Sequence, residues 1–497
     1  MNTIQKQQNS SQQDYIENFI QKYIQRTVKS KKLAQQYRPI MADKTSIGLG
    51  FTPELKELCY PIVIEQSSGS HLWDIDGNKY IDILMGLGIN LCGHNPPFVQ
   101  NAITDQLQQG MHIGVQNAIA GEVAQLISDL TGVERVTFSN TGTEAVMTAV
   151  RIARSATKRR KIAIFTNSYH GHFDAVLTRA TMSEYGKKAA RRAIENKVKS
   201  GSFLGKLAQP IQAVLAGNLN PKAVPAVPGI PNSVAEDVLI LEYGHPRSLD
   251  IIRKHRQELA AVLVEPVQSR FPELQPREFL HQLREITQKL GIVLIFDEMV
   301  TGFRIHPGGA QAHFGVQADI VTYSKIVGGG LPLSVIAGKA NYMNYIDGGK
   351  WNFGDDSSPQ TPTTFFAGTF CKHPLSLAAS RAMLSHLKTE GIALHQQLNQ
   401  KTTQLLSDLN TEIEKLGIPI KFTNFGSFYA IATSQSTVPP MAMNLLSYHL
   451  ISKGINLRQG DKGGFLSTAH TDEDIQTIKQ TWIESINELK KGEIITN

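Results

Sequence analysis

The chain has 497 residues, of which 41% are hydrophobic and 19% charged, so it can bury a large core and is expected to form more than one domain. A formal net charge of +7 is modest for this length and suits small anionic ligands as readily as nucleic acid, so charge alone selects no partner. The three widely spaced cysteines, Cys59, Cys92 and Cys371, exclude a disulfide framework and a thiolate metal cluster and favour a reducing cytoplasm.

Residues 1–50 are predicted to comprise a disordered start, a short amphipathic helix and a linker. The first dozen residues are polar and of low complexity, and they lack the apolar core of a signal peptide. No apolar run approaches the ~20 residues that cross a bilayer, so no membrane association is expected. Apolar residues recur at helical spacing from Tyr15 to Val28. We favour a helix packed on its own protein over one that docks on another protein.

Residues 51–111 are expected to form the N-terminal part of a small α+β domain, and residues 370–497 its C-terminal part. Asp76-Gly77, between strand-like residues, predicts a hairpin at a sheet edge. In residues 112–369, short apolar segments alternate with helical ones, which predicts a mostly parallel sheet covered by helices. Residues 186–231 are rich in proline and glycine and predict a surface insertion. The expected strands are 135–138, 161–165, 260–264, 292–296, 320–323 and 334–337.

Two chemically informative residues follow neighbouring predicted strands, Asp297 after one and Lys325 after the next. Open α/β sheets bind ligands at such strand ends. A lysine can bind the aldehyde of a cofactor covalently, and an aspartate can keep a pyridine nitrogen protonated so that the ring withdraws electrons from a substrate carbon. The pair therefore suggests an enzyme that uses pyridoxal phosphate.

Two further strand ends carry candidate ligand groups. Thr141, Gly142 and Thr143 lie between a predicted strand and a helix, where backbone N–H groups, the helix dipole and hydroxyls can bind a phosphate. A capped helix start without a ligand is the alternative. Tyr169 and His170 follow the next strand, and an aromatic ring there can stack on a planar cofactor. The alternative is a loop aromatic packed on the core.

In this order along the chain, the motifs resemble those of class III aminotransferases of fold type I, and most of all the glutamate-1-semialdehyde aminomutase branch, over about residues 64–384. The motifs are Asn-Thr-Gly-Thr-Glu-Ala from 140, Tyr-His-Gly-His from 169, Val-Glu-Pro-Val from 264, Phe-Asp-Glu-Met-Val-Thr-Gly-Phe-Arg from 296, Thr-Tyr-Ser-Lys from 322 and Phe-Ala-Gly-Thr-Phe from 366. The resemblance implies an α/β fold with a large cofactor-binding domain and a smaller α+β domain built from both ends of the chain. It also implies pyridoxal 5'-phosphate, pyridoxamine 5'-phosphate in the half-reaction, and a homodimer with shared active sites.

The resemblance further assigns site residues. Lys325 and Asp297 are implied to be catalytic, with Asp297 paired to the ring nitrogen. Met299 and Tyr169 would cover the two ring faces, and Thr369 from a second subunit would reach the phosphate. The implied cofactor-binding set is Thr141, Gly142, Thr143, Tyr169, Asp297, Met299, Lys325 and Thr369. No metal site is predicted.

The chain departs from the aminomutase pattern at positions that concern the substrate. Tyr243-Gly244-His245 replaces the Tyr-Asn-Asp that contacts the cofactor's phenolic oxygen, and Val300 replaces a glutamine of related aminotransferases. Arg270 stands where relatives carry glutamate or asparagine. We take Arg270, Val300 and His170 as substrate-side candidates. Glu144, Glu298 and Arg304 also match family motifs. For the two glutamates we favour structural ion-pair roles. Arg304 could either orient a substrate or form a structural salt bridge.

These departures, with Tyr37–Asp43 and His306–Gln311, resemble the aminotransferase domains of hybrid polyketide and nonribosomal peptide synthetases. The favoured activity is therefore transfer from an amino acid donor to a β-ketoacyl group on an acyl carrier protein, in polyketide or lipopeptide biosynthesis. Glutamate-1-semialdehyde aminomutase, or an aminotransferase acting on a free small keto substrate, is the alternative. A DNA regulator would need a winged helix-turn-helix for which the N-terminus leaves no room, so no nucleic acid partner is expected. Lys325 and Asp297 together argue against a pseudoenzyme.

Overall fold

The protein is described by a computed structural model that covers residues 3–47, 51–182, 221–458 and 463–495, and it forms two compact units. Unit 1 consists of Met1–Gln108, Arg270–Glu273 and His386–Asn497, and unit 2 of Gln109–Ser269 and Leu274–Ser385. The units divide at Gln108 and Ser385, whereas the sequence placed its domain borders after residues 111 and 369. Most of the insertion expected at 186–231 lies outside the described residues.

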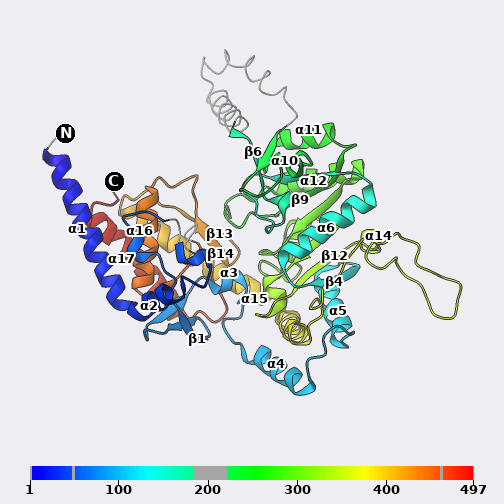
Figure 1. The fold of residues 1–497 in the computed structure, drawn as a ribbon, viewed down its shortest axis with the longest axis horizontal. Coiled ribbons are helices and arrows are strands. Elements are labelled where there is room, and N and C mark those ends of the chain that lie inside the picture. The colour runs from blue at the N-terminus through cyan, green and yellow to red at the C-terminus, as the bar shows by residue number, and fades with distance from the viewer. Residues whose placement is uncertain (1–2, 48–50, 183–220, 459–462, 496–497) are drawn as a thin grey trace, which may run out of the picture. The chain divides into compact units, whose positions relative to one another are not determined.

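Unit 2 is built on a seven-stranded sheet (Figure 1). The strand order is β4 (Arg135–Ser139), β12 (Ser334–Gly338), β11 (Ile320–Tyr323), β10 (Val293–Asp297), β9 (Leu259–Val264), β5 (Lys161–Phe165) and β8 (Val238–Leu241). β12 runs antiparallel to β4 and β11, and the other neighbouring strands are parallel. The predicted α/β class with a mostly parallel sheet is confirmed. The six expected strands are present, and β8 was not expected.

Helix α6 (Gly142–Thr157) covers the middle of this sheet. It packs on β9, β10, β11 and β12 because its buried alanines and Ile152 recur on one side of the helix. Helix α12 (Arg277–Leu290) packs on β10 and against α11 (Pro246–Lys254). The other described elements of unit 2 are α5 (Ile119–Thr131), α10 (Asn232–Glu236), α13 (Gly309–Phe314), α14 (Ala340–Met343), η3 (Asp174–Val176), η4 (Lys325–Gly328), β6 (Thr178–Ala180) and β7 (Ala223–Pro225).

Unit 1 contains two small sheets. The first has the order β1 (Ile64–Ser68), β2 (His71–Asp74), β3 (Lys79–Asp82) and β15 (Ile455–Asn456); the second, β13 (Phe422–Phe425), β14 (Phe428–Ile431) and β16 (Gly464–Phe465). The β2–β3 hairpin turns at Gly77, as predicted. It does not lie at a sheet edge, because β1 and the distant β15 pair with its two outer sides.

The helices of unit 1 come from both ends of the chain. They are α1 (Thr3–Arg26), α2 (Val28–Tyr37), η1 (Lys44–Ile47), η2 (Lys56–Leu58), α3 (Met85–Gly88), α4 (Pro97–Gln109), α16 (Pro440–Ser452) and α17 (Asp472–Lys491). Helix α15 (Pro374–Lys415) begins in unit 2, continues into unit 1 and is interrupted at Gly391. Among the described residues, no helix is both long and apolar enough to cross a membrane.

Helix α1 packs on its own unit, the arrangement we favoured. The Phe19 ring stacks on His449 of α16 with centroids 4.0 Å apart, and Tyr23 is buried with its edge toward Tyr448. The helix begins at Thr3, inside the polar start for which no regular structure was expected. It ends at Arg26, and a new helix begins at Val28. The expected helix from Tyr15 to Val28 is therefore the C-terminal half of a longer one.

Candidate active site

Asp297 and Lys325 lie at the same end of two adjacent strands of unit 2. Asp297 is the last residue of β10 and pairs in register with Thr322 of the parallel strand β11. Lys325 follows β11 and opens the short helix η4. Its backbone has φ +54°, a left-handed conformation that costs a non-glycine residue about 1–3 kcal/mol and is concentrated at functional sites. The topology therefore brings together the two residues that the sequence singled out.

Asp297 is 3% exposed, and each of its carboxylate oxygens has one hydrogen-bond partner. One oxygen lies 2.7 Å from Nδ1 of His170, and the other accepts a hydrogen bond from the backbone N–H of Met299 at 3.1 Å. His170 is itself only 2% exposed. We expected His170 on the substrate side, but the structure places it against Asp297, because the loop after β5 folds inward at this point.

The start of α6 forms a capping box. The Thr141 hydroxyl accepts a hydrogen bond from the Glu144 N–H, and the Glu144 carboxylate accepts one from the Thr141 N–H at 3.0 Å and one from Asn140 N–H at 2.9 Å. The N–H groups of Gly142 and Thr143, the next two of the helix, point out of its N-terminus by helix geometry. The capping box therefore occupies the side chains of Thr141 and Glu144 and leaves the N–H groups of Gly142 and Thr143 for the predicted phosphate site.

Glycines bring the neighbouring loops close to this helix start. A Cβ on Gly142 would lie 2.9 Å from Sδ of Met299, and a Cβ on Gly171 would lie 2.5 Å from Oγ1 of Thr143. His172 completes the second contact, because its N–H donates to the Thr143 hydroxyl at 3.2 Å. Met299 and the loop after β5 thus converge on the predicted phosphate site.

Tyr169 carries the aromatic ring of this loop. It is 53% exposed, and its backbone N–H donates to Glu265 at 2.9 Å. Glu265 is buried at the end of β9 and also accepts the Ser269 N–H at 3.3 Å. From the sequence, Glu265 was only a member of the Val-Glu-Pro-Val motif, with no function assigned.

The other predicted site residues differ in their exposure and in the unit to which they belong. Val300 is half-buried next to Met299, and Thr369 is exposed. The carbonyl of Phe370 accepts a hydrogen bond from the Asn140 side chain at 2.8 Å, so the segment that carries Thr369 reaches the α6 start of its own chain. Arg270 is exposed and belongs to unit 1, outside the unit that holds the other candidates.

The tripeptide Tyr243-Gly244-His245 is used for local structure. The buried Tyr243 hydroxyl donates to the Pro266 carbonyl at 2.6 Å, and His245 Nδ1 accepts the Arg247 N–H at 3.1 Å, which caps α11. Gly244 has φ +74°, which suits glycine. These hydrogen bonds therefore give the tyrosine and the histidine a structural role that requires no bound ligand.

Glu298 and Arg304 are completely buried. The Glu298 carboxylate accepts hydrogen bonds from the Ala310 and Gln311 N–H groups and from the Thr301 hydroxyl. Burial raises the pKa of Glu298 to about 7 despite these bonds. Glu298 thus fastens α13 to the end of β10 through hydrogen bonds, whereas a structural ion pair was expected.

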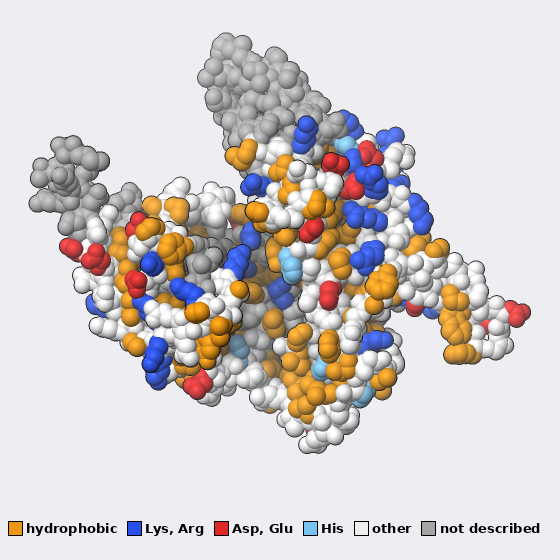
Figure 2. All heavy atoms as spheres, in the orientation of Figure 1, with side chains coloured by type: hydrophobic (Ala, Val, Ile, Leu, Met, Phe, Trp, Pro, Cys, Tyr) orange, Lys and Arg blue, Asp and Glu red, His pale blue; other side chains and the backbone are white. Residues whose placement is uncertain are grey.

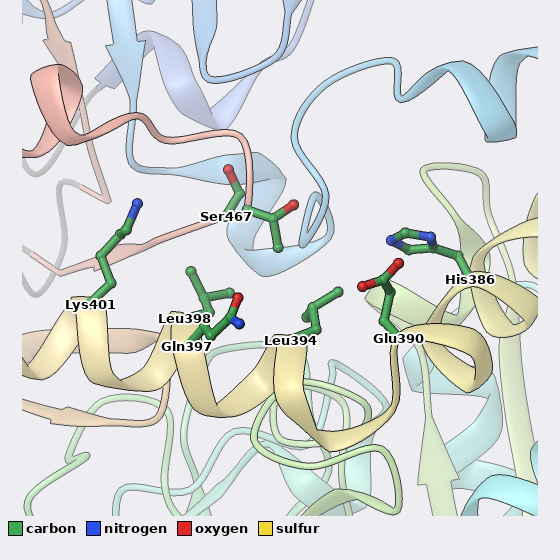
Figure 3. Close-up of a pocket in the computed structure, with 8 residues that line it drawn as sticks. His386, Glu390, Leu394, Gln397, Leu398, Lys401 and Ser467 are labelled. Atoms are coloured by element: carbon green, nitrogen blue, oxygen red, sulfur yellow. The ribbon is translucent and has the colours of Figure 1, made fainter.

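A separate cavity of about 310 Å³ lies within unit 1, along α15 (Figure 3). His386, Glu390 and Lys401 project from α15 around it, and Ser467 closes it from a distant part of the chain. Lys401 Nζ lies 3.0 Å from Asp472 and donates to the His470 carbonyl. The cavity contains none of the residues that the sequence selected as functional.

Three comparisons identify related proteins. The profile described as "Aminotransferase class-III" matches residues 54–463. Glutamate-1-semialdehyde 2,1-aminomutase of Chloroflexus aggregans is 33% identical over 436 residues, which cover 84% of this chain and 89% of the relative. An omega-transaminase from Sphaerobacter thermophilus superimposes with a TM-score of 0.76 at 25% identity, covering 93% and 98% of the two chains. A solved transaminase with PLP bound gives 0.76 at 26% identity, covering 94% and 99%.

Proposed function

Because the chain belongs to the class III aminotransferase family, we propose that it moves an amino group between carbon atoms at the site formed by Lys325 and Asp297. The family uses pyridoxal phosphate, and the fold is that of the fold type I enzymes. The observation that carries the proposal is geometric: a buried, imidazole-paired carboxylate and a strained lysine close the same end of adjacent strands β10 and β11.

The residues of unit 2 fit this cofactor. The N–H groups at the start of α6 suit a phosphate, and the missing side chain of Gly142 leaves Met299 room beside it. Asp297 supplies a negative charge for a ring nitrogen, and Tyr169 supplies an exposed aromatic face. When bound, the cofactor ring accepts the electron pair that remains on a substrate carbon after a proton leaves.

Lys325 has two proposed tasks. Its amine would hold the cofactor, and the same amine, when free, would move a proton from and to the substrate carbon. The Asp297 carboxylate would face the ring nitrogen of the bound cofactor. His170 keeps the Asp297 carboxylate oriented through the 2.7 Å contact. The capping box at Thr141 and Glu144 keeps the phosphate donors in place while Lys325 is detached.

The first candidate reaction is that of glutamate-1-semialdehyde 2,1-aminomutase. It is supported by the name of a relative that is 33% identical and covered over 89% of its length. In this reaction one small substrate exchanges its own amino and carbonyl positions, and no separate amino donor is needed. This support places the aminomutase ahead of the carrier-bound substrate that the sequence favoured.

The second candidate is transfer from an amino acid donor to a β-ketoacyl group on a carrier protein. It is supported by the Tyr243-Gly244-His245 segment, which lacks the Asn-Asp pair of the aminomutase pattern. Tyr243 and His245 make hydrogen bonds to nearby backbone groups. Val300 and the exposed Arg270 are further departures from the aminomutase pattern. These residues concern the substrate, so they are compatible with the same cofactor chemistry.

One experiment separates the candidates. Enzyme in the pyridoxamine form is incubated with glutamate-1-semialdehyde or with a β-ketoacyl carrier protein, and the products are followed by chromatography and by the intact mass of the carrier. Turnover of the semialdehyde alone supports the aminomutase. A carrier mass change that marks replacement of a carbonyl oxygen by an amine supports the second candidate. Turnover of neither, with amino transfer to small keto acids, indicates a free keto substrate.

We further propose a homodimer whose subunits share active sites, as is typical of the family. Unit 2 exposes large apolar side chains that a second copy would bury (Figure 2, on the loop that follows α14). The exposed set is Met111, Ile113, Val115, Trp351, Phe353, Phe365 and Phe370. Entry of Thr369 into the site of the second subunit and a cytoplasmic location stay predictions.

A further inference from the structure

Three ionisable side chains form a buried set behind the candidate cofactor site. Asp297 and Glu265 follow the paired residues Phe296 and Val264 at the ends of the parallel strands β10 and β9. His170 comes from the loop after β5, the strand on the other side of β9. The exposed fractions of Asp297, Glu265 and His170 are 3%, 5% and 2%. Two carboxylates are thus buried beside a single imidazole.

Each member of this set holds a different part of the site. His170 lies 2.7 Å from Asp297 through Nδ1, while its Nε2 is buried and has no hydrogen-bond partner in the described part of the chain. Glu265 accepts the Tyr169 N–H at 2.9 Å and the Ser269 N–H at 3.3 Å. Tyr169 and His170 are adjacent in sequence, so Glu265 fixes the backbone that carries both the exposed ring and the imidazole.

A second bond reinforces the same connection. The Gln268 side chain, 2% exposed, donates to the Thr166 carbonyl at 2.8 Å, which again joins the loop after β9 to the loop after β5. The ends of β9 and β5 are therefore tied together around Tyr169. A displacement of the Glu265 carboxylate would move Tyr169 and His170 together.

The electrostatics also point to a cationic ligand. Burial raises the pKa of Glu265, the imidazole of His170 lowers it, and Asp297 raises it again. Two other buried groups face this region, Tyr243 and Glu298, and burial raises the pKa of each. Neither adds a positive charge. Burying carboxylates is costly, so a bound cationic ring would stabilise the set.

We propose that Glu265 is a positioning residue for the cofactor ring, acting on Tyr169 through the backbone and on Asp297 through His170. The inference rests on the proposed use of pyridoxal phosphate. Glu265 touches neither substrate nor cofactor in this account. It sets where the stacking ring lies, and its charge stands behind the imidazole that orients the Asp297 carboxylate.

The test compares Glu265→Gln and His170→Gln with the wild type, and with Glu258→Gln as the matched control. Glu258 precedes the opposite end of the same strand β9 and is exposed. Apoprotein of each variant is titrated with pyridoxal phosphate and, separately, with inorganic phosphate. The absorbance of the bound cofactor is then recorded against pH, and the melting temperature of the apoprotein checks the fold.

Glu265→Gln and His170→Gln are expected to bind pyridoxal phosphate about tenfold to a hundredfold more weakly, the range for loss of one charged hydrogen-bonding partner. The pH at which the absorbance changes should move lower in Glu265→Gln, because a negative charge near the cationic site is gone. Inorganic phosphate affinity should stay within about twofold, since the α6 start is untouched, and Glu258→Gln should match the wild type.

Three results would each overturn a part of this account. A folded Glu265→Gln protein with wild-type cofactor affinity and an unchanged absorbance profile overturns the positioning role alone. Equal weakening of cofactor and inorganic phosphate binding also overturns it, because a general disturbance of the unit would then be the cause. A wild-type protein that binds no pyridoxal phosphate overturns the proposed function itself.

Discussion

Gly142 and Met299 lie so close that a Cβ at position 142 would be 2.9 Å from the Met299 sulfur and 3.4 Å from its methyl carbon. The contact joins the start of α6 to the residue that follows Asp297 by two positions. A side chain at position 142 would therefore displace the end of the Met299 side chain, although the helix itself would accept alanine readily.

Gly142→Ala is expected to weaken pyridoxal phosphate binding by about tenfold or more, because Met299 must move toward the ring site. Affinity is measured by titration of apoprotein. Gly121→Ala is the matched control, since Gly121 lies in helix α5 and its added Cβ would meet no atom within 4 Å. The control should bind normally and gain up to about 1 kcal/mol of stability. Normal cofactor affinity in Gly142→Ala would contradict the assigned contact.

Lys325→Ala should abolish amino transfer, with a loss of about a thousandfold or more, because both the anchor and the base are removed. The measurement is the rate of the half-reaction with an amino donor, together with the visible absorbance of the protein after cofactor addition. Lys289→Ala, at an exposed lysine of α12, is the control and should leave both unchanged. Substantial activity in Lys325→Ala would exclude the assigned role.

Acid is expected to loosen helix α1. Burial lowers the pKa of His449 to about 4, so the folded protein keeps this imidazole neutral where the unfolded chain protonates it. The stabilisation from His449 is therefore complete above about pH 6.5 and is lost as pH falls toward 4, by up to about 1.4 kcal/mol per pH unit. Glu488, whose pKa is lowered chiefly by Lys453 against the effect of burial, acts in the same direction.

Hydrogen exchange of α1 amides between pH 7 and pH 5, corrected for intrinsic rates, measures this effect. Tyr15, Phe19, Glu488 and Lys453 surround the imidazole, with the Tyr15 hydroxyl 3.1 Å from Nε2. His449→Phe keeps an aromatic ring against Phe19 but cannot titrate. It should flatten the pH dependence, and an unchanged slope would assign the effect to another group.

The exposed aromatic residues after α14 are expected to stabilise a dimer. Phe353 is 92% exposed and Trp351 46%, and the two rings pack edge to face with centroids 4.7 Å apart. Trp351→Ser with Phe353→Ser should raise the dimer dissociation constant at least tenfold, since burying such side chains contributes a few kcal/mol. Sedimentation velocity over a concentration series measures it. Val227→Ser, at another exposed apolar residue, should have no effect.

The sheet of unit 2 was largely predictable from residue patterns. The strands of the central region are short apolar runs that the structure buries on both faces, as in Ile292–Phe296 and Ile320–Tyr323. β8 (Val238–Leu241) was not predicted, although it is as short and as buried as β11. The antiparallel direction of β12 could not be predicted either, because apolar periodicity carries no information on strand direction.

The candidate site was predictable in its residue types and only partly in its geometry. Sequence motifs and positions after predicted strands identify Gly142, Thr143, Asp297 and Lys325. The orientation of His170 could not be predicted, because nothing in Tyr-His-Gly-His indicates whether its imidazole faces a substrate or the Asp297 carboxylate. The signal available for Glu265 was its place directly after a fully apolar strand, where a carboxylate needs partners.

The sequence by itself determined the fold class, the family and the lysine and aspartate pair, because these depend on local apolar patterns and on residues at fixed spacing along the chain. The tertiary structure decided what surrounds that pair. The contacts of Asp297 with His170, of Tyr169 with Glu265 and of Gly142 with Met299 join residues from different strand ends. Such contacts depend on which strands become neighbours and how their loops turn, which spacing along the chain does not specify.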